Sequence, residues 1–319
     1  MGASWEEKRP IDLINPGRAA MFLRLALDTP IDDIQPLKDG MFSQAFAFAM
    51  DGREYVLRIN EHLEDFQKDA YAHDRFTGPD LPIPAVVTMG QFDVNRHYCI
   101  TERCPGETLD ALGADSRQRI APDLLDKLDA IHARDVSDLP GWGLTDARGE
   151  GRFASWPHYL RSFYNQKFDF SWQTLIRDSL LERPLYMAVR AGFEELLTYV
   201  PQEKWLVHGD YGFDNVVAAG RRITGVLDWA EMRLGDFVYD IAYLDFWAKD
   251  SYYSNLWLAQ AQARGQETPH FQERRLCYML HQALGGLAIA AIRNDATEYA
   301  WLREYALKLA VEVSENFRD

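Results

Sequence analysis

Apolar and polar residues alternate at strand spacing through much of the first hundred positions. The runs FSQAFAFAM (42–50) and REYVLRIN (53–60) flank Asp51-Gly52, a dipeptide typical of a tight hairpin turn. A polar stretch with helical character follows at 61–76, and the runs LPIPAVVTMGQF and RHYCITERC then predict another pair of strands. This order predicts a small antiparallel sheet that carries one helix.

The pattern changes after Pro105-Gly106. Apolar residues between Leu124 and Ile131 recur at helical spacing, and most of the chain beyond Gly235 is helical in character. The glycine-rich residues 139–153 predict a long loop between helices. We therefore predict an α+β fold of two lobes, with an N-terminal antiparallel-sheet lobe at 1–104 and a larger, mainly helical C-terminal lobe at 105–319.

The composition indicates the class of protein and the cellular compartment in which it works. Of the 319 residues, 47% are hydrophobic and 26% charged, as in ordinary globular proteins, and the three cysteines form no paired motif. The N-terminal residues lack the apolar segment of a signal peptide, and the longest apolar run has nine residues, too few to span a bilayer. We expect a soluble cytoplasmic protein with reduced thiols.

The net charge of −15 argues against a nucleic-acid partner, because neutralising phosphates requires clustered Lys and Arg. It suits a cationic small molecule through long-range attraction, although solubility alone is the simpler explanation. We expect the partner to be a cationic small-molecule acceptor. We expect no membrane partner, and we expect the protein to be a monomer.

The segment LVHGDYGFDNVVAAGRRITGVLDW (206–229) contains the clearest chemistry. Asp210 and Asn215 precede the first strand of a predicted hairpin, and Asp228 ends the second. Antiparallel pairing brings the end of the second strand beside the start of the first, so Asn215 and Asp228 can share one ion while Asp210 points into the same space. Asp and Asn are also common turn formers, but this joint spacing favours phosphoryl transfer, which uses two oxygen ligands for Mg²⁺ and a carboxylate base.

His208-Gly209-Asp210, Asn215 and Asp228-Trp229 together resemble the catalytic core of the aminoglycoside phosphotransferases, relatives of the protein kinases. YVLRIN, LPIP, YCI and LVHGDYGFDNV recur in the same order in the members that act on hygromycin B, over roughly residues 35–250. The resemblance implies a protein-kinase-like bilobed fold, ATP as phosphoryl donor with GTP left open, and Mg²⁺.

The resemblance also implies residue roles. Asp210 is the expected catalytic base, Asn215 and Asp228 are the expected metal ligands, and His208 and Asp240 are expected to be structural. Protein kinases place an arginine before the catalytic aspartate, to pair with a phosphorylated loop, whereas this chain has Gly209. Only six residues separate Asp228 from Gly235, so we expect a kinase that needs no activation loop.

Arg58, at the end of YVLRIN, takes the place of the kinase lysine that contacts the α and β phosphates. Asp69 on the following helix is its expected partner. Lys68 is a rival phosphate contact, but a solvated helix face is the favoured interpretation of that residue. Gly40 stands in the nucleotide loop, and the Ser43 hydroxyl is a further candidate phosphate contact.

The adenine is expected where the two lobes meet. The side chain of Ile100 or Thr101 would line the back of the pocket, because the spacing allows two registers one residue apart. Backbone groups near Glu102 and Cys104 would contact the base edge.

Aminocyclitol antibiotics carry ammonium groups and hydroxyls, so their site needs carboxylates and aromatic faces. The candidate contacts in the C-terminal lobe are Asp214, Trp229, Glu231, Asp245, Trp247 and Trp257. Residues 141–153 are expected to cover the acceptor. The chain is thus predicted to be an ATP-dependent O-phosphotransferase acting on an aminocyclitol, such as hygromycin B, that confers resistance.

Two alternatives stay open at this point. The chain could be a metabolic kinase of choline, a sugar or a homoserine-like acceptor, which would keep the chemistry and change the acceptor. It could also be a nucleotide-binding regulator without catalysis, although retention of Asp210, Asn215 and Asp228 argues against this.

Overall fold

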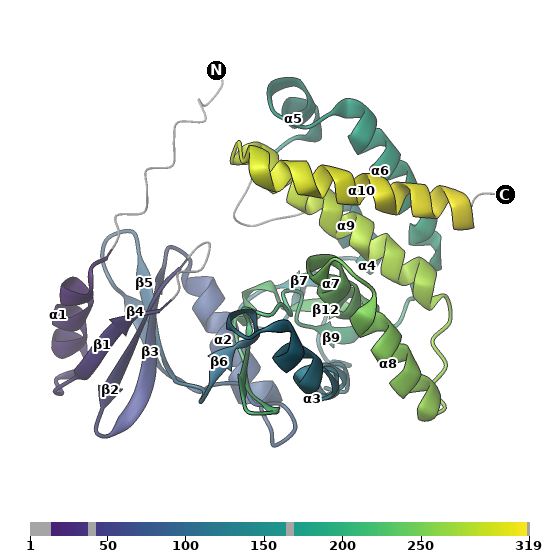
Figure 1. Ribbon diagram of the computed structural model, residues 1–319. Coiled ribbons are helices and arrows are strands. Elements are labelled where there is room, and N and C mark those ends of the chain that lie inside the picture. The colour runs from purple at the N-terminus through teal and green to yellow at the C-terminus, as the bar shows by residue number, and fades with distance from the viewer. Residues whose placement is uncertain (1–13, 38–42, 164–168, 318–319) are drawn as a thin grey trace.

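The first third of the chain folds into an antiparallel sheet, as its alternating pattern predicts (Figure 1). The computed structural model describes residues 14–37, 43–163 and 169–317. The strand order is β1-β2-β3-β5-β4, with β1 (Asp32–Pro36), β2 (Gln44–Met50), β3 (Arg53–Asn60), β4 (Val86–Gln91) and β5 (His97–Glu102). Asp51 and Gly52 both have positive φ, 51° and 73°, which a two-residue hairpin turn requires.

Two helices pack on opposite faces of this sheet, so the prediction of a single helix was wrong. Helix α1 (Pro16–Leu27) shares a hydrophobic cluster with Leu57 and Ile100. Helix α2 (Leu63–Phe76) lies on the other face, where the Arg58 guanidinium stands over the Phe66 ring. Because successive side chains of a strand alternate between faces, the face that holds Arg58 is distinct from the face that holds Ile100.

The rest of the chain is mainly helical and contains two small sheets, with orders β11-β10-β6 and β8-β7-β12-β9. The predicted α+β fold with an N-terminal antiparallel sheet and a helical C-terminal region is confirmed, whereas the lobe boundary at 104/105 stays a prediction. The helices are α3 (Ala114–His132), α4 (Trp156–Ser162), α5 (Trp172–Asp178), α6 (Arg183–Leu196), α7 (Val238–Ala248), α8 (Tyr252–Ala263), α9 (Phe271–Ile292) and α10 (Ala296–Asn316). The strands are β6 (Glu107–Thr108), β7 (Trp142–Thr145), β8 (Gly151–Phe153), β9 (Trp205–Val207), β10 (Val216–Ala219), β11 (Arg222–Val226) and β12 (Arg233–Gly235).

The prediction of a long loop at 139–153 was wrong, because this stretch contains the antiparallel pair β7 and β8. Its glycines reflect close packing rather than looseness. Gly143 has φ of 71°, and a Cβ there would lie 2.4 Å from the ring of Tyr159. The residue type that suggested an irregular loop is therefore the one that lets this strand pack against α4.

The core of the helical region is built around α9, which contacts α6, α7 and α10. By length and composition, α9 is the one helix within the described residues that could cross a membrane. Of its most apolar 18-residue window, 72% is buried inside the fold. Burial of this kind is what a central core helix requires.

Candidate active site

A β-hairpin brings the two predicted metal ligands together. Strands β10 and β11 pair in antiparallel fashion, with Val216 opposite Val226, and the Leu227 amide donates to the Asn215 carbonyl at 2.8 Å. Asn215 and Asp228 therefore flank the open end of one ladder. Asp228 adopts φ 58°, a left-handed conformation that aspartate tolerates better than most residues.

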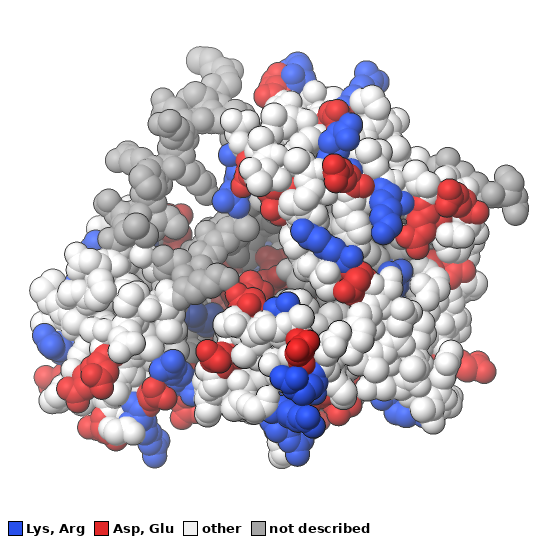
Figure 2. Space-filling view, in the orientation of Figure 1, with Lys and Arg blue, Asp and Glu red and all other residues white. Residues whose placement is uncertain are grey.

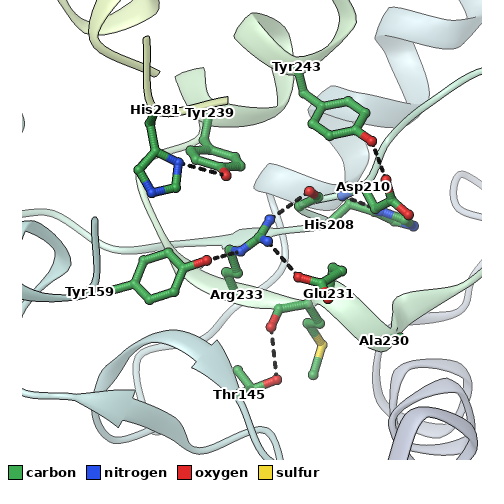
Figure 3. A network of polar contacts seen from close by, with 12 residues as sticks. Thr145, Tyr159, His208, Asp210, Ala230, Glu231, Arg233, Tyr239, Tyr243 and His281 are labelled. Carbon is green, nitrogen blue, oxygen red and sulfur yellow. Dashed lines mark hydrogen bonds and ion pairs between the residues drawn. The ribbon is translucent and has the colours of Figure 1, made fainter. Parts of the chain in front are cut away.

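The predicted base, Asp210, is held by two side chains. The Asn215 amide nitrogen donates to Asp210 Oδ2 and to the Asp210 carbonyl, at 2.9 Å in each case. The phenol of Tyr243, on α7, donates to Asp210 Oδ1 (Figure 3). One Asp210 oxygen thus points to the metal-ligand side of the site, and the other contacts an aromatic residue that sequence reasoning missed.

The electrostatic environment of Asp210 suits a base at neutral pH. The pKa of Asp210 is raised to about 7, chiefly by burial and also by the negative charges of Asp228, Asp214 and Glu231, while the hydrogen bond from Tyr243 opposes the rise. A carboxyl with a pKa near neutrality can accept a proton and release it again.

Asp240 holds the main chain just before Asp210 in place. Its two carboxylate oxygens accept from the amides of His208, at 2.9 Å, and Gly209, at 2.8 Å, and His132 Nε2 lies 3.2 Å from Oδ2. Burial lowers the pKa of His208, so its ring is neutral: Nε2 donates to the Leu227 carbonyl at 3.0 Å, and Nδ1 accepts from the Asp210 amide at 3.3 Å. These hydrogen bonds are of the kind that the structural roles predicted for His208 and Asp240 require.

The residues expected on the phosphate side form a chain of contacts that ends at Trp229, the residue after Asp228. Arg58 pairs with Asp69, and the other oxygen of Asp69 accepts from the Trp229 amide at 2.8 Å. Burial by itself would lower the pKa of Arg58, but the charge of Asp69 keeps it raised and the guanidinium charged. The expected partner of Arg58 thus also ties α2 to the residue after Asp228.

The expectation that Lys68 lies on a solvated helix face was wrong. Its side chain is fully buried, and Nζ donates to the Ala230 carbonyl at 2.8 Å. Burial lowers the pKa of this ammonium group. Helix periodicity could not reveal this, because the partner lies 162 residues along the chain.

The two candidates for the back of the adenine pocket, Ile100 and Thr101, lie on opposite faces of the sheet. Thr101 lies opposite Val56 on the sheet face that also holds Arg58, whereas Ile100 lies opposite Leu57 within the cluster around α1. This alternation favours Thr101 as the pocket residue. Glu102 is exposed at the end of β5, Ser43 directly precedes β2, and Cys104 is half-buried against Gly225 of β11. Gly40 lies outside the described residues.

Only some of the acceptor candidates reach the surface. Asp214 is exposed, Glu231 is half-buried, and Trp247 is 38% exposed with its ring centroid 6.0 Å from that of Tyr243. Figure 2 shows a hollow between the sheet lobe and the helical lobe with acidic side chains visible inside it. These residues can offer charge and an aromatic face to a cation.

The remaining acceptor candidates lie in the core. Trp229 and Trp257 are each 1% exposed. Asp245 is fully buried and accepts from Arg275 Nε at 2.8 Å and from the Ser254 amide at 3.1 Å. Helix α7 is buried on almost every side, and its two aspartates, Asp240 and Asp245, are both fully buried. Burial argues against an acceptor contact by these three residues.

The β7–β8 segment, expected to cover the acceptor, packs on α2 instead. Arg152 pairs with Glu64, and a Cβ at Gly149 would overlap the ring of Tyr71. These contacts tie the helical lobe to the helix that carries Asp69. The segment thus holds the two lobes together, and its part in covering an acceptor stays a prediction.

The donor set fits Mg²⁺. Asn215 directs its amide nitrogen at Asp210, which leaves the amide oxygen as the atom for a metal, and Asp228 supplies a carboxylate. Within the described part of the chain no group of three or more His, Cys, Asp or Glu side chains could hold a metal ion. Mg²⁺ in phosphoryl-transfer sites needs no such cage, because substrate phosphates and water complete its octahedron.

Residues 33–278 match the phosphotransferase enzyme family. The chain belongs to this family. A hygromycin-B 4-O-kinase from Escherichia coli is 31% identical over 283 residues, covering 85% of this chain and 78% of that relative. The phosphotransferase fold is thus shared along almost the whole described chain, and the protein is an aminoglycoside phosphotransferase-like kinase.

Solved structures of phosphotransferases are similar to this chain over most of its length. Aminoglycoside phosphotransferase APH(4)-Ia superposes with a TM-score of 0.81 at 28% identity, covering 93% of this chain and 99% of that one. A thermostable mutant of that protein, solved in ternary complex with AMP-PNP and hygromycin B, gives a TM-score of 0.80 at 27% identity, with coverage of 93% and 99%. Aminoglycoside 2'-phosphotransferase-IIIa, solved with GDP, shares the fold at 14% identity and a TM-score of 0.69, with coverage of 94% and 99%.

Sequence reasoning missed two residues of this phosphotransferase site, Tyr243 and Arg233. Tyr243 follows Asp240 by three positions on α7, which places both on one helix face. This face is directed toward the loop at 208–215, which carries Asp210 and Asn215 and is called the catalytic loop below. That spacing could have revealed Tyr243. Arg233 contacts Gly209 from β12, and nothing in its local sequence indicates a link to a residue 24 positions earlier.

Proposed function

We propose that this phosphotransferase moves the γ-phosphoryl group of ATP to a hydroxyl of an aminocyclitol antibiotic, hygromycin B, and so confers resistance to it. The observation that carries the proposal is the joint contact of Asn215 and Tyr243 with Asp210 beside Asp228. The proposed base and the two proposed metal ligands therefore lie around one point. The hygromycin-B 4-O-kinase relative supports the choice of acceptor.

Asp210 takes the proton of the acceptor hydroxyl while the new oxygen–phosphorus bond forms. The bond between the γ-phosphorus and the bridging oxygen breaks, and ADP leaves with its electron pair. Asn215 and Asp228 would hold Mg²⁺, which neutralises charge on the phosphates when it is bound. Arg58, which pairs with Asp69, would contact the donor phosphates with a permanent positive charge.

The acceptor side is suited to cations. Asp214 and Glu231 supply negative charge near Asp210, and Trp247 offers a partly exposed ring for a sugar or an ammonium group. The net charge of −15 adds long-range attraction for a polycation. We place the reaction in the cytoplasm, where ATP is abundant, and expect a monomer to perform it.

The test is magnesium-dependent ADP release by the purified protein across a panel of hygromycin B, other aminoglycosides, choline and simple sugars, with ATP and GTP as donors. The matched control is Asp210→Asn, which keeps the size of the side chain and removes the base. Stimulation by hygromycin B in the wild type, reduced about 10²- to 10⁴-fold in the variant, is the expected result. Stimulation by choline or a sugar alone would replace the acceptor, and stimulation by no member would refute the proposed function.

A further inference from the structure

Arg233 lies buried directly beneath the catalytic loop. Its side chain is 8% exposed, and each guanidinium nitrogen has its own partner at 2.6 Å. Nε donates to the Tyr159 hydroxyl, Nη1 to the Gly209 carbonyl and Nη2 to Glu231 Oε2. Figure 3 shows the guanidinium at the centre of this network, with Tyr159 and Glu231 on its two sides.

The contact with Gly209 concerns catalysis because that carbonyl belongs to the peptide that leads into Asp210. The amide side of Gly209 is held by Asp240, and the Asp210 amide is held by His208. Arg233 supplies the remaining restraint on this peptide. Rotation of the 209–210 peptide would swing the Asp210 side chain away from Asn215 and Tyr243.

The shapes of the two residues fit each other. Gly209 has φ of 82°, and a Cβ there would lie 2.0 Å from Arg233 Nη1 and 2.3 Å from the Glu231 carbonyl. Arg233 therefore occupies the space that any side chain at position 209 would take. Protein kinases place an arginine in the chain at that point, whereas here the guanidinium arrives from β12.

Stability alone does not account for a buried guanidinium at this place. Replacing a buried ion by an apolar residue of similar volume is often neutral for stability, and arginine cannot lose its charge. The Glu231 carboxylate balances this charge, and Nη1 also satisfies the carbonyl of the buried residue Gly209. Rings of Tyr159 and Tyr239, 5.7 Å and 5.0 Å from the guanidinium carbon, stabilise the cation there.

From these contacts we propose that Arg233 is a positioning residue that fixes the Gly209–Asp210 peptide for phosphoryl transfer. In protein kinases the arginine before the aspartate pairs with a phosphorylated loop, whereas Arg233 pairs with Glu231, which needs no phosphorylation. The proposal rests on the function proposed above, in which Asp210 is the base.

The test compares Arg233→Met and Arg233→Lys with Tyr159→Phe, which removes a different partner of the same guanidinium and leaves the Gly209 contact in place. Measured quantities are kcat and KM for hygromycin B, the Kd for MgADP, the Tm, and the slow hydrolysis of MgATP without acceptor. Arg233→Met is expected to lower kcat about 10²-fold, the size of effect that a small misplacement of a catalytic group produces, with the Kd for MgADP changed less than about threefold. Arg233→Lys should recover part of kcat, and Tyr159→Phe should keep kcat within about threefold of wild type.

Unchanged kcat in Arg233→Met, or equal losses in Arg233→Met and Tyr159→Phe, would overturn the proposal. If Arg233→Met does not fold, Arg233→Lys against Tyr159→Phe provides the same comparison. A wild-type protein that phosphorylates no acceptor would refute the proposed function instead. Acceptor-independent hydrolysis would then still show whether the Arg233 variants are impaired more than Tyr159→Phe.

Discussion

The hydroxyl of Tyr243 donates a hydrogen bond to Oδ1 of Asp210, the oxygen opposite the one that contacts Asn215. This hydrogen bond holds one oxygen of the proposed base in place. Tyr243 also lowers the pKa of Asp210 against the larger effects of burial and of Asp228. The residue thus bears on both the position and the protonation of the base.

Tyr243→Phe should move the acidic limb of the pH profile of kcat/KM upward. Without this hydrogen bond the pKa of Asp210 rises above about 7, so the base stays protonated to higher pH. A hydrogen bond to a charged group is worth about 1.5–3 kcal/mol, and about 1.4 kcal/mol corresponds to one pH unit, so we expect a shift of about one to two units. Tyr239→Phe, on the same helix and bonded to His281, should leave the limb in place.

Asp210→Asn should be inactive yet more stable than wild type at pH 8. The pKa of Asp210 is about 7 in the folded state and about 3.9 for an unfolded chain, so the folded protein binds this proton more tightly. The free energy of unfolding therefore falls as pH rises from about 4 to about 7 and remains low above that range. Thermal unfolding of both proteins from pH 5 to pH 8 measures this, and a Tm difference that shrinks toward pH 8 would contradict it.

Asp228→Ala should abolish the dependence of nucleotide affinity on magnesium. Asp228 and Asn215 are the oxygen donors at the open end of the β10–β11 ladder, and a single neutral amide is a weak site for Mg²⁺. Titration of ADP with and without Mg²⁺ checks this. Asp126→Ala, an exposed carboxylate on α3, is the control and should keep the wild-type response. Retention of magnesium-dependent binding in Asp228→Ala would remove Asp228 as a ligand.

Asp69→Asn should weaken nucleotide binding by about tenfold or more. The asparagine oxygen can still accept from the Trp229 amide, but Arg58 loses the buried charge that orients it. Loss of a charge-assisted hydrogen bond costs about 1.5–3 kcal/mol. Calorimetry with MgADP measures the change. Glu54→Gln breaks the exposed pair with Arg103 and should have almost no effect, so equal losses in the two variants would contradict this account.

Local pairing explains why the centre of the site could be predicted from the sequence. Asp210, Asn215 and Asp228 lie within nineteen positions, and one hairpin determines where they meet. The turn at Asp51-Gly52 was predictable for the same reason, since the dipeptide itself supplies the positive φ values. Neither prediction needs any knowledge of distant contacts.

Contacts between distant elements account for the predictions that failed. Lys68 looks solvated along its own helix and is buried only because η3 (Trp229–Glu231) packs on α2. In the sequence, Asp245 resembles a ligand-binding carboxylate. In the structure it pairs with Arg275 from α9. Arg233 acquires its role from Gly209, which belongs to another strand–loop unit.

The mass of hygromycin B after incubation with MgATP and either wild-type protein or Asp210→Asn shows directly whether Asp210 is the base and hygromycin B the acceptor. We expect the wild-type product to gain one phosphoryl group and the variant, with nucleotide affinity preserved, to yield almost none. Equal phosphorylation by the two proteins would show that Asp210 is not the base, and unmodified hygromycin B with the wild type would show that the acceptor is a different molecule.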